Sequence, residues 1–283
     1  MAAACHLRSG SLPSKSHPLA ASVEEQLTRL KAPSGSIFNK LGALKDLYER
    51  VDDLFQLPVT QQALSHEHQD KCLEEMLDGS LRLLDVCGTT RDVFSQMKEC
   101  VQELESSLRR KRAAESSIEN EVQAYTNSRK RLSKVISKCS GNLKRMEKKC
   151  IALSLNKDSD LVVVVSMLKE VEEISLMVFQ SLLSFVSLSK ARSRYAGWSI
   201  VSKLLLSRQI PCQAQAYASE VENMDVELLN LIGKTSTSLV EMQNVLKGLE
   251  ALDSTIQQTE EELECIYRRL LKSRVSLLNM SNY

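Results

Sequence analysis

The chain has 283 residues, of which 43% are hydrophobic and only 4% aromatic, and its formal net charge is +1 at pH 7. With nine glycines and five prolines, this composition favours helices over a β-sheet protein, and the near-zero charge excludes a chain that binds polyanions over its whole surface. The eight cysteines are scattered and form no C-x-x-C pair, which argues against a disulfide framework. We interpret them as small buried hydrophobic residues of a cytoplasmic protein, with the nucleus or a plastid as alternative locations.

The first 36 residues are rich in Ser, Ala, Pro and basic residues, and their first acidic residue is Glu24. This composition predicts a disordered N-terminal tail over residues 1–36. Val23, Leu27 and Leu30 have the spacing of a short helix within it. An acid-poor start that contains serine and arginine is also typical of an organelle transit peptide, although no strong amphipathic helix accompanies it.

The tail contains the sequence Arg8-Ser9-Gly10-Ser11-Leu12-Pro13. It fits the pattern R-S-x-S-x-P, which 14-3-3 proteins bind when the second serine is phosphorylated. A phosphate on Ser11 would add a charge of about −1.5 to −2 and three acceptor oxygens for an arginine cluster in the partner. Arg8 would attract the kinase, and Pro13 would turn the peptide out of the groove. The alternative is an accidental match in a Ser/Pro-rich tail.

Helical spacing of apolar residues begins at Ile37 and continues to Phe55, where Pro58 is expected to end the first firm helix. A second helix is predicted from about residue 65 to Cys87. His66, His68 and Cys72 stand close together there, as zinc ligands could, but a fourth ligand is not evident, and the simpler interpretation is two solvent-facing histidines and a buried thiol.

A break is expected at Gly88, with Thr89 capping a long helix over about residues 90–155. Its apolar residues keep a three-four rhythm that only Lys111, Glu115 and Arg129 interrupt, which is typical of the narrow seam of a coiled coil. The seam residues are Phe94, Met97, Val101, Leu104, Leu108, Ile118, Val122, Tyr125, Leu132, Ile136, Cys139, Leu143, Met146, Cys150 and Leu153.

The middle of this helix is basic, because residues 109–149 hold 13 Lys and Arg against 4 Asp and Glu. Such a patch indicates nucleic-acid binding, nuclear import or contact with anionic lipid, or else a helix face that pairs with acidic residues of the same protein. The candidate patch residues are Arg109, Arg110, Lys111, Arg112, Arg129, Lys130 and Arg131.

An acidic counterpart follows, with 11 Asp and Glu against 2 Lys over residues 220–264. Its apolar spacing predicts a second long helix over about residues 216–280, and antiparallel pairing would match the acidic with the basic segment. We favour this internal pairing over nucleic-acid binding. Between the two, residues 161–185 predict a buried helix, since its uncharged run of 15 residues, Ile174 to Leu188, is too short to span a membrane.

Together these patterns predict an all-α fold, an elongated helical bundle with long, coiled-coil-like antiparallel helices, in which residues 37–283 form a single domain. No Gly-rich phosphate loop, paired catalytic carboxylates or Ser/His or Cys/His set stands at a recognisable spacing. We therefore predict that the chain is not an enzyme and has no cofactor, catalytic residue, metal site or small-molecule substrate.

Several short motifs resemble a plant-specific family of unknown biochemical function, the Bypass-related proteins, over nearly the whole chain. The most specific is Cys87-Gly88-Thr89-Thr90-Arg91-Asp92, and others are His6-Leu7-Arg8-Ser9, Ser11-Leu12-Pro13-Ser14-Lys15-Ser16-His17-Pro18, Val23-Glu24-Glu25-Gln26-Leu27, Asp46-Leu47-Tyr48, Thr60-Gln61-Gln62-Ala63-Leu64, Leu77-Asp78-Gly79-Ser80, Gly197-Trp198-Ser199 and Arg274-Val275-Ser276-Leu277-Leu278-Asn279. The resemblance implies a land-plant protein with a role in root and shoot development, and it supplies no catalytic residues.

Two function classes remain. The first is a non-enzymatic interaction, scaffold or regulatory protein with protein partners, among them 14-3-3 proteins through phosphorylated Ser11. The second is a peripheral membrane or nucleic-acid binding protein that uses the basic segment 109–149.

Overall fold

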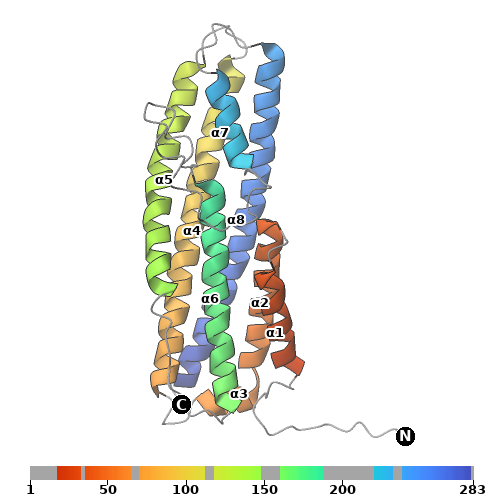
Figure 1. Cartoon of the computed structure of the whole chain (residues 1–283), viewed down its shortest axis with the longest axis vertical. Helices are drawn as coiled ribbons and strands as arrows, with labels where there is room; N and C mark the ends of the chain where they lie inside the picture. The colour runs from red at the N-terminus through yellow and green to blue at the C-terminus, as the bar shows by residue number, and fades with distance from the viewer. Residues whose placement is uncertain are drawn as a thin grey trace, which may run out of the picture. The chain divides into compact units, whose positions relative to one another are not determined.

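The structure is a computed structural model that describes residues 18–32, 36–64, 70–111, 118–147, 160–187, 220–231 and 238–281 (Figure 1). Every element in these ranges is an α-helix, so the all-α prediction is confirmed for this part of the chain. The helices are α1 (Pro18–Lys31), α2 (Ile37–Phe55), α3 (Pro58–Leu64), α4 (Asp70–Lys111), α5 (Glu119–Glu147), α6 (Asp160–Val186), α7 (Glu220–Leu231) and α8 (Leu239–Ser281).

The chain divides into two compact units. Unit 1 comprises Met1–Arg91, Cys139–Leu182 and Thr259–Tyr283, and unit 2 comprises Asp92–Lys138 and Leu183–Gln258. Unit 1 therefore takes α1, α2, α3, the first part of α4, the last part of α5, most of α6 and the last part of α8. Unit 2 takes the rest of α4, most of α5, α7 and the first part of α8.

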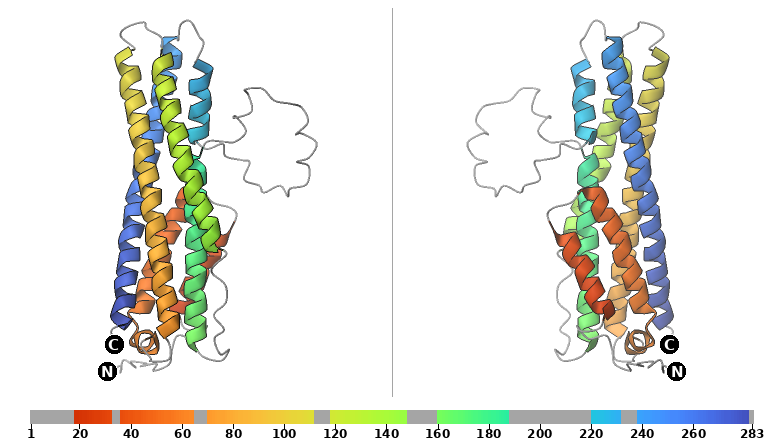
Figure 2. Two further views of the ribbon diagram at one scale, coloured as in Figure 1. Left: turned by 90° about the vertical axis from the view of Figure 1, so that its left-hand side faces the viewer. Right: turned by 90° about the vertical axis from the view of Figure 1, so that its right-hand side faces the viewer.

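Helix α1 corrects the prediction that residues 1–36 form a disordered tail. Its three-four spacing places Ala20, Val23, Leu27 and Leu30 on one stripe, and all four are buried. The helix lies beside α2 in unit 1 (Figure 2), so a short apolar stripe that would be unstable alone is stabilised by tertiary packing. Residues 1–17 lie outside the described part of the chain.

The predicted break at Gly88 is wrong, because α4 continues through it. The hydroxyls of Thr89 and Thr90 donate hydrogen bonds to the carbonyl oxygens of Asp85 and Val86, four residues earlier, so they lie within the helix and cap nothing. A Cβ atom at Gly88 would lie 4.0 Å from Cε2 of Tyr267 on α8, an ordinary van der Waals contact, so the packing here does not require glycine.

The predicted long helix over residues 90–155 is also wrong, since α4 ends at Lys111 and α5 begins at Glu119. Helix α4 thus ends at Lys111, the first position where a charged residue replaces an apolar residue of the seam. Lys111 Nζ lies 2.9 Å from the Glu121 carboxylate in unit 2.

The second long helix, predicted over residues 216–280, is likewise divided, into α7 and α8. A capping box starts α8: Glu241 N–H donates to Ser238 Oγ (3.2 Å), and Ser238 N–H donates to Glu241 Oε2 (3.0 Å). The sequence Ser238-x-x-Glu241 carries this signal, but the continuous apolar spacing on both sides masks it.

We expect Ser238→Ala to destabilise unit 2 by about 1 kcal/mol, because the variant leaves the N–H groups of the first turn of α8 without their side-chain acceptor. Ser254→Ala is the matched control, since Ser254 is exposed in the middle of α8. Urea unfolding followed by circular dichroism measures both variants. Equal stability of the two would show that the capping box contributes nothing.

Each unit has its own apolar core. In unit 1, Leu44, Leu47 and Leu54 of α2 are fully buried together with Leu176, Phe179 and Leu182 of α6, and in unit 2 the seam residues of α4 and α5 are buried. Among the described helices, none combines the length and apolar character needed to cross a bilayer. Helix α6 buries Val164, Val171, Val178 and Leu182, which confirms the prediction of a buried helix for residues 161–185.

Candidate functional site: a buried polar cluster in unit 1

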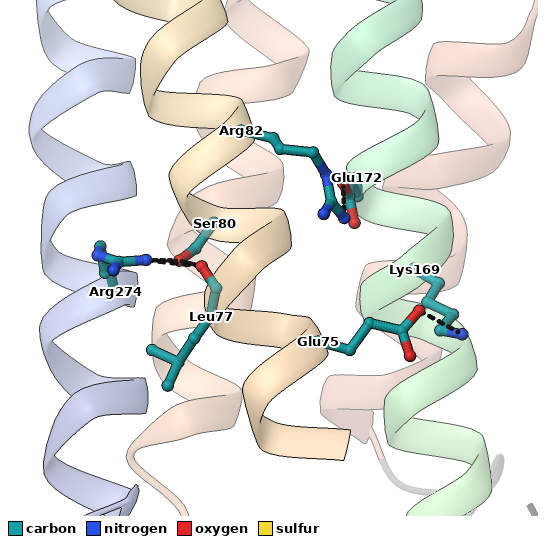
Figure 3. Close-up of polar contacts among 7 residues, drawn as sticks. All are labelled: Glu75, Leu77, Ser80, Arg82, Lys169, Glu172 and Arg274. Carbon is teal, nitrogen blue, oxygen red and sulfur yellow. Dashed lines mark hydrogen bonds and ion pairs between the residues drawn. The ribbon is translucent and has the colours of Figure 1, made fainter. Parts of the chain in front are cut away.

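The last helix and the fourth helix are joined by one arginine. Arg274 on α8 donates from Nη1 to the carbonyl oxygen of Leu77 (2.6 Å) and to Ser80 Oγ (2.8 Å) on α4 (Figure 3). Ser80 Oγ also donates to the same Leu77 carbonyl (2.7 Å). Two motifs almost 200 residues apart, Leu77-Asp78-Gly79-Ser80 and the segment that starts at Arg274, therefore meet in space.

A buried carboxylate on α6 lies against the same part of α4. Glu172 is 9% exposed, and its Oε1 accepts from Arg82 Nε (3.0 Å) and Nη2 (2.8 Å) (Figure 3). Its Oε2 faces Gly79, where a Cβ atom would lie only 2.6 Å from it. Gly79 thus allows α4 and the carboxylate to approach closely, which explains a glycine in the middle of a helix.

A second ion pair joins the same two helices: Lys169 Nζ of α6 lies 3.2 Å from Glu75 Oε1 of α4 (Figure 3). Both side chains are partly exposed, so the pair contributes little to stability but helps to set the register between α4 and α6.

A cavity of about 60 Å³ lies among these residues. Its lining is mainly apolar, with Gly79, Ser80, Glu172 and Ser273 among the polar or small members. This volume holds a few water molecules and is far below the roughly 300–1,000 Å³ of small-molecule sites. The geometry therefore favours a structural lock between helices over a pocket for a substrate.

Two further buried polar pairs bring α2 into the lock. The hydroxyls of Tyr48 on α2 and Ser175 on α6 lie 2.7 Å apart. Ser273 Oγ on α8 donates to the buried Asp52 carboxylate on α2 (3.0 Å). Each polar group in these pairs finds a partner on another helix, so the pairs specify which helices pack together as well as how tightly.

The motif from Cys87 to Asp92 faces α8. Cys87 Sγ lies 3.8 Å from the carbonyl oxygen of Leu263. The Arg91 guanidinium lies 4.9 Å from the ring centroid of Tyr267 and pairs with Glu264. The motif therefore fixes α4 against α8 and presents no open reactive group.

We expect stability to fall more steeply at alkaline pH because of Cys87, since burial raises the pKa of its thiol to about 12. An unfolded thiol ionises near pH 8.5. Above that pH the unfolded chain loses a proton that the folded chain retains, so unfolding is favoured by up to about 1.4 kcal/mol per pH unit. Urea titrations of the wild type and Cys87→Ala at neutral and alkaline pH measure the effect. If the free energy of unfolding falls equally with pH in both proteins, the effect does not come from Cys87.

Unit 2 contains a second polar cluster, around Arg129 of α5. This side chain is 1% exposed, and its Nε and Nη2 donate to the two carboxylate oxygens of Asp225 on α7, at 3.3 and 3.0 Å. Its Nη1 donates to the Val186 carbonyl at the end of α6 (2.7 Å), and Tyr125 donates its hydroxyl to Asp225 (2.9 Å).

The predicted basic patch is thus not one surface. Arg129 is buried, which corrects its place in that patch, and Lys111 pairs with Glu121. Arg109 is exposed and pairs with Glu105 and Glu250, whereas Lys130 and Arg131 are exposed. Arg110 is also exposed and donates to Ser107, and Arg112 lies outside the described residues.

Other predicted site residues also fall outside the described ranges, namely the motif of Arg8, Ser11 and Pro13 and the pair His66 and His68. Cys72 is buried, and within the described ranges no three His, Cys, Asp or Glu side chains are placed to hold a metal ion.

Comparison with known proteins shows which family carries these motifs. The family model described as Protein BPS1 matches residues 40–280. The chain belongs to the BPS1 family. The Bypass-related resemblance is therefore confirmed, and the match covers α2 to α8 almost entirely. No curated protein and no solved structure matched the chain.

Within the BPS1 match, the residues that sequence reasoning overlooked are Arg82, Glu172 and Asp225. The burial of Glu172 could have been anticipated, because this residue stands in α6 beside the buried Val171 and two residues before the buried Ile174. Asp225 had none, because it is one acid among many in an acidic segment and only the tertiary structure places it beside Arg129.

Proposed function

We propose that this chain is a non-enzymatic interaction protein with a regulatory or scaffold role in plant root and shoot development. The developmental role rests on BPS1 family membership. One observation supports a non-catalytic role: the motif residues Ser80, Cys87 and Arg274 make contacts between helices of unit 1. Burial also raises the pKa of the Cys87 thiol, so it is protonated at neutral pH and a poor nucleophile.

Affinity purification from root and shoot tissue tests this proposal. Bait proteins are the full chain and Arg129→Met, a variant expected to loosen unit 2. Partners that are retained by the folded bait and lost with the variant support an interaction role. A chemical turnover by the purified chain that survives partner removal would contradict it.

Phosphorylated Ser11 is the proposed docking point for a 14-3-3 protein. The support is the sequence alone, with Arg8 three residues before the serine and Pro13 two residues after it. A peptide from His6 to Pro18, with and without phosphate on Ser11, is titrated against a plant 14-3-3 protein. We expect binding of the phosphorylated form only, and weaker binding after Arg8→Ala. Equal binding of both forms would refute the motif.

The second candidate function is peripheral binding to a polyanion through the basic segment 109–149. The observation that favours it is the exposure of Lys130, Arg131, Lys134 and Lys138 on α5. The two functions are compatible, because the interior of unit 1 and this exposed face use different residues.

A further inference from the structure

The solvent face of α5 in unit 2 carries a line of positive charge. Lys130, Arg131, Lys134 and Lys138 are all exposed. At 100° per residue these four fall within one sector of the helix, opposite the buried Val122, Tyr125, Leu132 and Ile136. The four side chains are called the α5 basic stripe below.

Acidic residues do not compensate this stripe. From Val122 to Lys138 the sequence contains no Asp or Glu. The neighbouring bases are neutralised internally, as Arg129 is by Asp225 and Lys111 by Glu121. Within the described ranges, by contrast, none of the stripe residues forms an ion pair. The structure thus separates the basic segment into bases that hold unit 2 together and bases that face solvent.

We propose that the α5 basic stripe docks unit 2 onto anionic phospholipid headgroups. This inference rests on the second candidate function above and names its partner. Clusters of four to eight bases on an amphipathic helix are typical of such membrane contacts. The stripe runs from Lys130 to Lys138, eight residue steps or roughly 12 Å of straight helix, and so presents its charges to a flat surface in one line.

Two observations favour a membrane over a nucleic acid. Val135 is 41% exposed beside the stripe, and an apolar side chain among lysines gains by contact with the headgroup–acyl boundary. Among the described residues of α5, the only aromatic side chain is Tyr125, which is buried, so the exposed face offers no ring on which bases could stack.

The test is co-sedimentation of the full chain with vesicles of phosphatidylcholine, alone or mixed with phosphatidylserine. We expect binding only to the mixed vesicles, and release at high salt because the charges are exposed. Each base near an anionic surface strengthens binding about fivefold, so Arg131→Gln/Lys134→Gln/Lys138→Gln should weaken binding on the order of 100-fold.

The matched control is Arg29→Gln/Lys247→Gln/Arg268→Gln, which removes the same charge from exposed bases outside the basic segment 109–149. Equal loss of binding in both triple variants, or no loss in the stripe variant, would overturn the proposal. So would tighter binding to duplex DNA or RNA than to mixed vesicles at the same salt. Retention of protein partners by the stripe variant would show that the interaction function stands independently.

Discussion

Arg129→Met is expected to destabilise unit 2 by about 3–5 kcal/mol, the largest effect of any single substitution discussed here. Methionine fills a similar volume but leaves the Asp225 carboxylate without its ionic partner and the Val186 carbonyl without its donor. A buried charge that loses its partner keeps its desolvation cost and gains nothing in return. Urea unfolding followed by circular dichroism measures the loss.

Three further variants give this prediction its controls. Lys130→Met changes the exposed neighbour and should alter stability by less than about 0.5 kcal/mol. Arg129→Lys keeps the charge but cannot reproduce the planar fork that reaches Asp225 and Val186 together, so it should give an intermediate loss. Arg129→Met/Asp225→Leu removes both charges and should recover much of the stability. If Arg129→Met and Lys130→Met are equally stable, the cluster contributes nothing.

The effect of Gly79→Ala on the stability of unit 1 should depend on residue 172: destabilising when it is Glu172, stabilising when it is alanine. In the wild-type chain the new Cβ atom would lie 2.6 Å from Glu172 Oε2, a carboxylate already held by Arg82. Such overpacking costs about 1–3 kcal/mol, which exceeds the gain of about 1 kcal/mol from replacing glycine in a helix. In the Glu172→Ala background the clash is absent, and the same substitution should stabilise unit 1 by about 1 kcal/mol.

Gly42→Ala is the control for this prediction, because a Cβ atom at position 42 on α2 meets no other atom within 4 Å. It should stabilise the protein by about 1 kcal/mol in both backgrounds. Thermal and urea unfolding of the six proteins complete the double-mutant cycle. Stabilisation by Gly79→Ala in both backgrounds would mean that Glu172 moves aside freely and does not lock α4 to α6.

The sequence by itself determined that the described chain is helical and which apolar residues of the seam are buried. Apolar spacing in the seam is a local property, and the predicted seam residues Phe94, Met97 and Val122 are all fully buried. The same phase also contains Arg129, which the sequence placed in the candidate basic patch, with pairing to the acidic segment 220–264 as the favoured alternative. The apolar spacing predicted the burial of Arg129 better than its charge did, because Asp225 supplies an ionic partner inside unit 2.

Helix boundaries were less predictable, because helix and turn compete by small free energies at Gly88 and near Lys111. At Gly88 the threonine hydroxyls bond within α4 and the Tyr267 ring packs nearby, so the helix continues. Near Lys111 the charged seam positions have nothing to bury, so the helix ends. The sequence therefore predicted a break at Gly88, where the helix continues, and a continuous helix through Lys111, where the helix ends.

Only the tertiary structure decided which polar residues meet. Arg274 reaches Leu77, Arg82 reaches Glu172, and Arg129 reaches Asp225, across separations of 90 to 197 residues. No local pattern encodes such a pairing, because a charged side chain has the same local preferences whether its partner is a buried carboxylate or water. Burial and geometry supply that information: they placed Arg129 inside unit 2 and left Lys130, Arg131, Lys134 and Lys138 facing solvent.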